Sequence, residues 1–398
     1  MRVAYLVCDP GIPIGGTKGA SVHVASVARA LGSIGVQVTV FAPKVEPPGI
    51  PGTEVVEVPV GPVPSGAAGE LRRIEASKNF YESVARHLDG AGYDLVMERL
   101  SLFADGGGLG RRLGLPRLVE VNAPVAAERE AHFGLANREA ANLAEASALR
   151  DAAVVAVSEP LADWAVARGA ATAQVIPNGA DTALLEPGRW QAEGAKLRAE
   201  FGFEDLQVIG FVGSLKPWHG LEPLFEAAGL LAGARRFGLL VVGDGPGRDA
   251  VQAGLASLRQ RIPALAAGAV PAQRVPAYLA AMDIAVAPYL PSGNFYFSPL
   301  KVVEAMAAGK AVVASDFPPV RELLGDCGVL VRAGDPEALA SALDRLILSP
   351  SIRHELGERA RRRALERADW VEVARRTLAA AQAAQRMKSP VGPRVAAI

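Results

Sequence analysis

One stretch of the sequence, FYFSPLKVVEAMAAG at residues 295–309, marks both ends of a helix. Ser298 is a good N-cap, and Pro299 is tolerated at the first helical position because its missing N–H has no helical partner there. Gly309 serves as the stop, and the apolar strand Ala311–Ala314 follows. A helix joined so closely to an apolar strand is typical of parallel sheets covered by helices.

The same alternation of short apolar runs with longer amphipathic stretches continues through the 398 residues, in two series. A domain holds about 100–200 residues, so this length predicts two domains. We expect an N-terminal domain at 1–185 and a C-terminal domain at 186–369. The closing helix 370–398 has no strand partner of its own, and the family resemblance described below implies that it packs back on the first domain. Each is expected to be a Rossmann-like, doubly wound parallel sheet of the α/β class.

In the first series the pattern predicts strands at Arg2–Cys8, Val36–Ala42, Thr53–Pro59, Asp94–Glu98, Arg117–Val121, Ala153–Val157 and Gln174–Ile176. The predicted helices are Ser21–Leu31, Leu71–Leu88, Ala126–Arg150 and Pro160–Arg168, and a linker follows at Ile176–Trp190. The second series predicts strands at Gln207–Gly213, Phe237–Val242, Asp283–Pro288, Ala311–Ala314 and Val329–Val331. Its predicted helices are Leu221–Leu231, Gly247–Leu258, Val275–Ala281, Pro299–Ala308 and Pro336–Leu348, followed by Ser351–Arg367 and Trp370–Met387.

The charge balance argues against a polyanionic partner. Half of the residues are hydrophobic, and 42 basic residues match 42 acidic ones. A chain without net charge is not drawn to nucleic acid as a whole, so we expect no nucleic-acid partner. The run Arg361–Arg363 could touch an anionic membrane, but Glu358 and Glu366 dilute it, and a solvated helix face is the simpler interpretation.

The two cysteines, Cys8 and Cys327, lie far apart and form no CxxC pair. A reducing, cytoplasmic location is therefore expected. The N-terminal apolar run is too short for a signal peptide, and no run of about 18 apolar residues predicts a membrane span. Neither HExxH nor a convincing Asp-x-Asp pair is present, so we expect no metal site and no bound cofactor.

Two glycine-rich loops each lead into a helix. The first, after Asp9, contains Gly15 and Gly16 but fails the P-loop pattern because its lysine comes one place late. The second, from Gly243, has Arg248 where the GxGxxG pattern needs its last glycine. Each loop is either a tight turn or an anion-binding start of a helix, and the residues alone favour neither.

Lys301 falls in the first turn of the predicted 299–308 helix, where the helix dipole disfavours a cation by about 0.3–1 kcal/mol. A diphosphate bound at the helix N-terminus would explain the lysine, because Lys301 and the helix N–H groups would face the same anion. Glu304 lies on nearly the same face and could accept hydrogen bonds from a ribose diol. The alternative is an exposed Lys301–Glu304 surface pair.

These features together resemble the retaining glycosyltransferases of the GT-B fold, specifically family 4. The most specific match is 300-LKVVEAMAAGKAVVAS-315, which is similar to the family's donor-site helix and the strand after it. Val155-Ala-Val-Ser158, Val175-Ile-Pro-Asn-Gly-Ala-Asp181, Gly213 and Val241-Val-Gly-Asp-Gly-Pro246 follow the family's order. The resemblance runs nearly end to end.

The resemblance implies that the N-terminal domain binds the acceptor, that the C-terminal domain binds a nucleotide sugar, and that the two domains face across a cleft. It implies a ribose contact at Glu304 and a backbone contact to the base in the loop Gly268–Val270. Gly15 and Gly16 would approach the donor phosphates. The predicted donor-binding residues are Gly15, Gly16, Gly213, Ser214, Lys216, Gly243, Val270, Ser298, Leu300 and Glu304.

The chain departs from the family's pattern at three places. The first of two glutamates commonly present falls on Tyr296, which leaves the transferred sugar without its usual carboxylate contact. Ser214 and His219 stand where an arginine and a lysine commonly neutralise the diphosphate, so Lys301, with Lys216 or His219, would compensate. We therefore predict Lys301 and His219 as electrostatic catalytic residues.

The third departure is Asn122, at the place where many relatives carry a histidine. Its amide can hydrogen-bond the transferred sugar or the acceptor but cannot act as a base. His23 would face the cleft if its glycine loop does, or it is a capping or solvated histidine. Glu128 either lines the acceptor site or is an exposed residue of a helix start. Together with Tyr296, these residues are the predicted acceptor- or sugar-binding set.

The predicted activity is transfer of a hexosyl-type unit from a nucleoside-diphosphate sugar to a hydroxyl group of a glycan, a lipid-linked glycan or a small metabolite, with the anomeric configuration retained. Another GT-B enzyme, such as a nucleotide-sugar epimerase or a phosphorylase, is an alternative. A nucleotide-sugar-binding protein without transfer activity is a third, because of Tyr296. The donor base and sugar, the acceptor, the catalytic base and the oligomeric state stay open.

Overall fold

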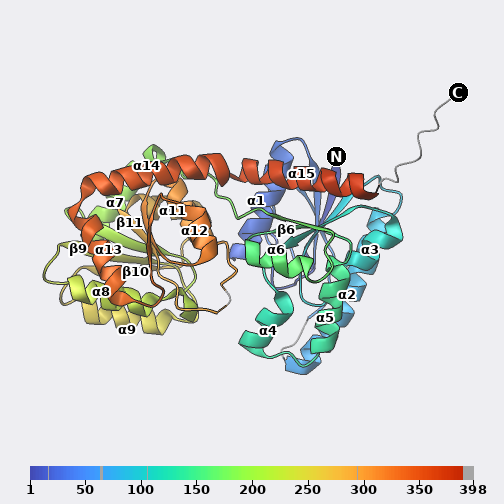
Figure 1. Ribbon diagram of the computed structural model, residues 1–398, viewed down its shortest axis with the longest axis horizontal. Helices are drawn as coiled ribbons and strands as arrows, with labels where there is room; N and C mark the ends of the chain where they lie inside the picture. Colours follow the sequence, from blue (N-terminus) through green and yellow to red (C-terminus); the bar gives the residue numbers. More distant parts are fainter. Residues whose placement is uncertain (17, 63–65, 105, 294, 389–398) are drawn as a thin grey trace. The chain divides into compact units, whose positions relative to one another are not determined.

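The computed structural model describes residues 1–16, 18–62, 66–104, 106–293 and 295–388. Contacts divide the chain into two units. Unit 1 comprises Met1–Pro177 and the closing segment from Val371, and unit 2 comprises Asn178–Trp370. In Figure 1 the blue-to-green part of the chain and the red helix α15 form unit 1. The last part of the predicted helix 370–398, residues 389–398, lies outside the described residues.

Unit 1 is built on a parallel sheet in the order β3-β2-β1-β4-β5-β6-β7. Its strands are β1 (Arg2–Leu6), β2 (Gln37–Ala42), β3 (Glu54–Glu57), β4 (Leu95–Arg99), β5 (Arg117–Val121), β6 (Ala153–Ala156) and β7 (Thr172–Val175). The strands β4 and β5 are buried along their whole length, as expected for a sheet with helices on both faces. Their register places Arg99 opposite Glu120 at the carboxyl end of the sheet.

The helices of unit 1 are α1 (Gly19–Ser33), α2 (Gly66–Leu88), α3 (Gly106–Leu113), α4 (Val125–Phe133), α5 (Arg138–Leu149) and α6 (Glu159–Val166), joined by α15 (Trp370–Lys388). The closing helix α15 packs on this unit. Arg376 donates to the Val175 carbonyl at 2.6 Å, and Gln385 donates to the Asp94 carbonyl at 3.2 Å.

Unit 2 is also built on a parallel sheet, in the order β10-β9-β8-β11-β12-β13. Its strands are β8 (Gln207–Val212), β9 (Phe237–Val242), β10 (Ala264–Gly268), β11 (Ile284–Ala287), β12 (Ala311–Ser315) and β13 (Val329–Val331). Its helices are α7 (Gln191–Phe201), α8 (Leu221–Leu231), α9 (Arg248–Leu258), α10 (Val275–Ala280), α11 (Leu300–Ala307), α12 (Pro318–Leu324), α13 (Pro336–Leu348) and α14 (Pro350–Arg367). Both sheets therefore have the strand order of the doubly wound Rossmann fold.

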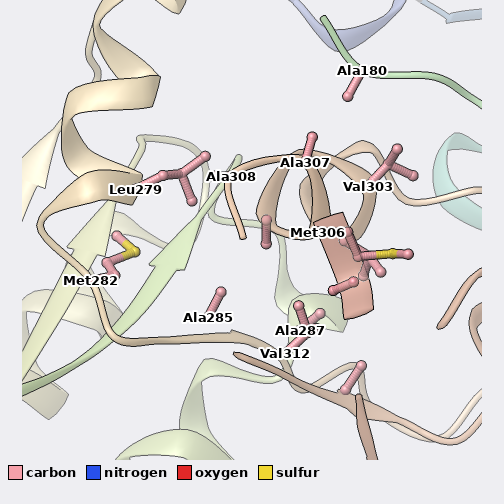
Figure 2. Close-up of a cluster of buried hydrophobic side chains, with 14 of the residues drawn as sticks. Ala180, Leu279, Met282, Ala285, Ala287, Val303, Met306, Ala307, Ala308 and Val312 are labelled. Carbon is pink, nitrogen blue, oxygen red and sulfur yellow. The ribbon is translucent and has the colours of Figure 1, made fainter. Parts of the chain in front are cut away.

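Helix α11 is fixed by its apolar face. Figure 2 shows Val303 and Met306 of α11 in the same cluster as Val312 of β12 and Ala287 of β11. Full burial of one side chain of this size contributes about 1.5–3 kcal/mol to folding. The polar residues of the helix are thereby held on the opposite face, away from the core.

The structure corrects one predicted helix and adds elements. The segment 126–150 forms two helices rather than one, because Gly134 adopts a positive φ of 75°. Glu70 then holds the connecting loop through the backbone N–H of Ala136 and of Asn137, at 3.2 and 2.8 Å. The sequence pattern also missed the helices α3, α7 and α12 and the strand β10.

The boundary between the units differs from the expected residue 185. Residues 178–185 belong to unit 2, because Asn178 hydrogen-bonds Ser298 and because Ala180 forms a parallel bridge with Asp369. The predicted linker is thus partly structure of unit 2.

Candidate functional site

The carboxyl end of the second sheet gathers most of the residues predicted to bind the donor. Strands β8 and β11 are neighbours in the sheet, and the chain winds outward from them in opposite directions. Ligands of doubly wound sheets bind outside the carboxyl ends of the strands at such a switch point. Gly213 follows β8, and the segment from Pro288 to helix α11 follows β11.

The start of α11 is held by a residue far away in sequence. Asn178 donates its backbone N–H to the Ser298 hydroxyl at 2.9 Å and its side-chain amide to the Ser298 carbonyl at 2.7 Å. Pro299 is the N-cap residue, and its own side chain makes no cap hydrogen bond. The prediction that Ser298 is the N-cap is therefore wrong, because its hydroxyl accepts from Asn178 instead.

Lys301 lies inside the site rather than on the surface. Its Nζ atom is buried and has no hydrogen-bond partner among the described residues. It lies 4.1 Å from the ring centre of Phe211 and 5.2 Å from that of Tyr289. Gly213 leaves it room, because a Cβ at that position would come within 3.0 Å of the ammonium. Lys301 thus places its amino group in an aromatic pocket, and no acidic side chain among the described residues hydrogen-bonds it.

Lys301 and Glu304 are the two ionisable groups of α11. Burial shifts the pKa of each more than the charge of the other does. Burial lowers the pKa of Lys301 to about 7, and Glu304 opposes this shift. Burial likewise raises the pKa of Glu304 to about 7, against the influence of Lys301. Because the Lys301 Nζ atom is buried, the alternative of an exposed Lys301–Glu304 surface pair is wrong. Both groups are poised to change charge near neutral pH.

His219 lies beside Lys301 in the same pocket. Its ring centre is 5.4 Å from that of Tyr289 and 6.0 Å from that of Phe211. Burial, and then the charge of Lys301, lower the pKa of His219 to about 3. Since Nδ1 donates to the Ser214 carbonyl at 2.5 Å, Nε2 is left as an acceptor in the neutral ring. In the ligand-free protein His219 is therefore uncharged at neutral pH.

The glycine loops of unit 2 are tight turns that pack on one another. Gly243 has a φ of +134°, and a Cβ there would come within 1.9 Å of the Gly213 carbonyl oxygen. The Leu215 N–H donates to the Asp244 carbonyl at 3.0 Å. Only glycine fits such a close approach of two backbones. This packing brings the ends of β8 and β9 together beside Lys301.

The other predicted donor residues lie at the same end of the second sheet. Lys216 Nζ lies 5.4 Å from the ring centre of Trp218, next to His219. Val270 follows β10 and packs against the core at its edge. Tyr296 and Leu300 flank Ser298, and the Tyr296 ring centre lies 4.4 Å from that of Phe297. An aromatic surface therefore occupies the place of the family's first glutamate.

In unit 1 the loop after β1 is a tight turn. Gly15 has a φ of +90°, and a Cβ there would come within 2.0 Å of the Glu46 carbonyl oxygen. The Gly16 N–H already donates to the Pro13 carbonyl at 3.1 Å. Both glycines are required by the local backbone, and their approach to a donor phosphate stays a prediction.

A buried polar cluster lies at the carboxyl end of the first sheet. His23 is only 5% exposed, and its Nε2 atom contacts the Glu120 carboxylate. Tyr5 donates its hydroxyl to the same carboxylate. His23 is therefore neither a capping nor a solvated histidine. Burial alone would raise the pKa of Glu120, but His23 and Arg99 hold it well below its usual range.

Asn122 follows β5 and lies beside this cluster, close enough to Glu120 to help lower its pKa. Glu128 lies in the first turn of α4, partly exposed. Within the ranges that the structure describes, no three His, Cys, Asp or Glu residues are placed to share a metal ion. No helix in those ranges is long and apolar enough to cross a membrane.

Comparison with known proteins decides the family. Residues 206–349 match the family model described as "Glycosyl transferases group 1", and residues 17–184 match "Glycosyltransferase Family 4". The D-inositol 3-phosphate glycosyltransferase of Corynebacterium efficiens is 30% identical over 90% of this chain and 90% of its own. The chain belongs to glycosyltransferase family 4. The MMP alpha-(1->4)-mannosyltransferase of Mycolicibacterium hassiacum is 26% identical over 95% of this chain and 97% of its own.

Solved structures show the same fold for this family 4 glycosyltransferase. Sucrose-phosphate synthase from Thermosynechococcus elongatus superimposes with a TM-score of 0.74 and 22% identity, over 97% of this chain and 98% of that one. The HepE protein of Anabaena, in complex with UDP-glucose, gives a TM-score of 0.71 with 20% identity, over 96% and 100% of the two chains. The expected GT-B class with two Rossmann-like units is confirmed. The enzyme is a hexosyltransferase that uses a nucleotide sugar.

Sequence reasoning missed several residues that shape these sites. Phe211 and Tyr289 form the walls around Lys301, and Asn178 holds the start of its helix. Arg99 and Glu120 could have been found from their charges, because both are charged residues in the short, mainly apolar strands LVMER and RLVEV. The aromatic residues carry no such signal.

Proposed function

We propose that this family 4 glycosyltransferase holds the diphosphate of its donor at the N-terminus of α11, against Lys301. The observation that carries the proposal is the Lys301 ammonium, which is buried, has no hydrogen-bond partner in the described part of the chain and lies in the first turn of a helix at the switch point of the sheet. The first N–H groups of a helix have no helical partner and attract anions. A diphosphate would satisfy both the helix and the lysine.

The same geometry suggests how the reaction is promoted. As the sugar leaves, negative charge grows on the diphosphate while the sugar becomes oxocarbenium-like. Lys301 and the α11 N–H groups would stabilise that charge, and the approach of the diphosphate would favour protonation of His219. Gly213, Ser214, Lys216 and Gly243 would line the phosphate side of the pocket. No metal ion or other cofactor is needed in this proposal, because protein groups supply the positive charge.

The remaining donor contacts in unit 2 are assigned from where the residues lie along the carboxyl end of the second sheet. Glu304 would accept hydrogen bonds from the ribose diol, and the loop ending at Val270 would meet the base. Tyr296 would lie against the transferred hexosyl unit, where an aromatic ring can pack on the apolar face of a sugar. Gly15 and Gly16 of unit 1 would complete the phosphate contacts.

We propose that the anomeric configuration is retained, with the leaving phosphate helping to deprotonate the acceptor hydroxyl. The acceptor side would be formed by unit 1 near His23, Asn122 and Glu128. The names of the mannosyltransferase and inositol-phosphate relatives support a hydroxylated acceptor. A reducing cytoplasmic location fits the two buried, free cysteines, Cys8 and Cys327.

The test is to identify the product of a reaction with the nucleotide sugar that binds best and a panel of hydroxyl acceptors. Proton NMR of the product gives its anomeric configuration, and a parallel reaction with a chelator tests metal dependence. We expect the donor's configuration in the product and an unchanged rate with the chelator. Inversion would contradict the proposed mechanism, and loss of activity with the chelator would contradict the metal-free site.

A further inference from the structure

The cluster at the carboxyl end of the first sheet is organised around the Glu120 carboxylate. Its Oε1 atom contacts His23 Nε2, and its Oε2 atom accepts the Tyr5 hydroxyl. Both oxygens are thus already used by short contacts. Arg99, the partner of Glu120 in the β4–β5 register, lies further off, with its Nη1 atom 3.5 Å from Oε1. Arg99 is therefore ion-paired with Glu120, but its Nη1 atom is not in hydrogen-bond geometry with the carboxylate.

The donors that remain are buried and unsatisfied. Arg99 is 9% exposed, and its Nη1 atom has no hydrogen-bond partner within the described ranges. The amide nitrogen of Asn122, two residues beyond Glu120, likewise has no partner in hydrogen-bond geometry among those residues, although it lies near enough to the carboxylate to help lower its pKa. A buried donor without a partner costs about 1–3 kcal/mol, so such atoms are rare in native proteins. Arg99 and Asn122 both lie beside the Glu120 carboxylate, and two such donors at one place are explained by a ligand that accepts from them.

The position is that of a binding site. Strands β1 and β4 are neighbours from which the first sheet winds in opposite directions, and Arg99 ends β4 at this switch point. Doubly wound sheets bind ligands there. Because Arg99 Nη1 and Asn122 Nδ2 can only donate, the ligand must supply acceptor oxygens. The planar guanidinium matches the two oxygens of a carboxylate or phosphate.

We propose that Arg99 and Asn122 bind an anionic group, a carboxylate or a phosphate, on the acceptor substrate. The enzyme then selects acceptors that carry a negative charge near the hydroxyl that receives the sugar. This inference rests on the proposed function, which places the acceptor on unit 1. It does not depend on Lys301, since Arg99 and Lys301 belong to different units.

The experiment measures binding to the full chain by thermal shift, with the nucleoside diphosphate that stabilises it most present at saturation. The diphosphate site is then filled and does not compete for the probes. Glycerol 3-phosphate, glycerate and glycerol are titrated at constant ionic strength, so that the three probes differ in the charged group. A ligand that binds only the folded state raises the melting temperature as its concentration exceeds its Kd.

The variants are Arg99→Gln, Asn122→Asp and the control Arg111→Gln. Asn122→Asp is isosteric and places a carboxylate where the anion would bind. Arg111 is an exposed arginine of the same unit, at the far end of α3, which follows β4. Circular dichroism and the shift produced by the nucleoside diphosphate alone show whether each variant is folded and keeps its donor site.

We expect one or both anionic probes, but not glycerol, to stabilise the wild type and Arg111→Gln. Both site variants should weaken anion binding at least tenfold while keeping the nucleoside-diphosphate shift. Phosphate and carboxylate are distinguished by which probe binds. The inference is overturned if no anionic probe binds, if glycerol binds equally well, or if Asn122→Asp binds anions like the wild type. Absence of any nucleoside-diphosphate shift would instead contradict the proposed donor site, and the probes would still report on Arg99.

Discussion

Asn178 and Ser298, 120 residues apart in sequence, are joined by two hydrogen bonds at the start of α11. Asn178→Ala removes the bond from the amide to the Ser298 carbonyl and leaves the backbone bond in place. A buried carbonyl that loses its partner costs about 1–3 kcal/mol. We expect part of this free energy to be lost from donor binding, because the start of α11 is held less firmly. The Kd for a nucleoside diphosphate, measured by calorimetry, should therefore rise about tenfold.

The matched control is Asn137→Ala in unit 1. Its side-chain amide donates to Glu70 at 3.0 Å, so the loss is similar in kind but distant from α11. We expect a lower melting temperature with unchanged donor affinity. An Asn178→Ala protein that binds the nucleoside diphosphate as tightly as the wild type would show that Asn178 does not position the helix.

Replacing Lys301 should lower the affinity for a nucleoside diphosphate without lowering the stability of the free protein. Lys301→Met removes the buried ammonium, for which the described residues supply no hydrogen-bond partner, and keeps an apolar chain of similar length. The melting temperature of the free protein should stay the same or rise, because an unpaired buried charge destabilises folding. Nucleoside-diphosphate affinity should fall about 10- to 100-fold, as expected for loss of a charge-assisted hydrogen bond of about 1.5–3 kcal/mol.

Lys196→Met is the control, because Lys196 is an exposed lysine of α7 in the same unit. It should change neither quantity. The opposite pattern at position 301, a less stable protein with normal affinity, would mean that Lys301 has a structural role only.

Donor affinity should depend on pH through Lys301. Burial lowers its pKa to about 7 in the free protein, so above pH 7 the amine is neutral and must take up a proton when the diphosphate binds. Affinity for a nucleotide sugar should therefore weaken by up to about tenfold per pH unit above pH 7. Calorimetry in buffers of different ionisation enthalpy measures the proton uptake. Lys301→Met should lose this dependence, and a flat profile in the wild type would contradict the assignment.

Glu120→Gln should destabilise the protein strongly. The substitution leaves Arg99 and His23 buried without the carboxylate they share, and breaking such a pair costs about 3–5 kcal/mol. The pKa of Glu120 is lowered in the folded state, so its contribution is present above the pKa of the unfolded carboxyl and is lost as the pH falls further. Urea unfolding from pH 7 to pH 3 should show a smaller acid dependence in the variant.

Glu57→Gln is the corresponding control, because Glu57 is an exposed carboxylate at the end of β3. It should shift the urea midpoint little. A Glu120→Gln protein as stable as Glu57→Gln would indicate that the cluster is solvated in solution.

The fold could be predicted wherever apolar runs had clear periods and marked ends. Strands β5, β9 and β13 and helices α8 and α13 begin and end at the predicted residues. The missed elements lack such signals. Helix α3 is GGGLGRRL, in which four glycines oppose helix formation, and α7 buries only Gly194 and Leu197. Strand β10 is alanine-rich, and α12 opens with two prolines.

The candidate donor site was predictable at its centre and not at its walls. Lys301 could be predicted because a cation in the first turn of a helix is unfavourable without a bound anion. Glu304 could be predicted because it lies on nearly the same face of the helix. The contact between Asn178 and Ser298, and the rings of Phe211 and Tyr289 around Lys301, depend on how distant segments pack. No local pattern encodes such contacts, so they appear only in the folded structure.

The most direct test of the account is a thermal-shift panel of nucleotide sugars and nucleoside diphosphates on the wild type, Lys301→Met and Glu304→Ala. At a hundred times its Kd a ligand stabilises the folded state by about 2.7 kcal/mol, which is readily measured. We predict that at least one nucleotide sugar raises the melting temperature of the wild type, and that both substitutions reduce the shift. If no nucleotide sugar or nucleoside diphosphate shifts the wild type, the donor site at the start of α11 is contradicted.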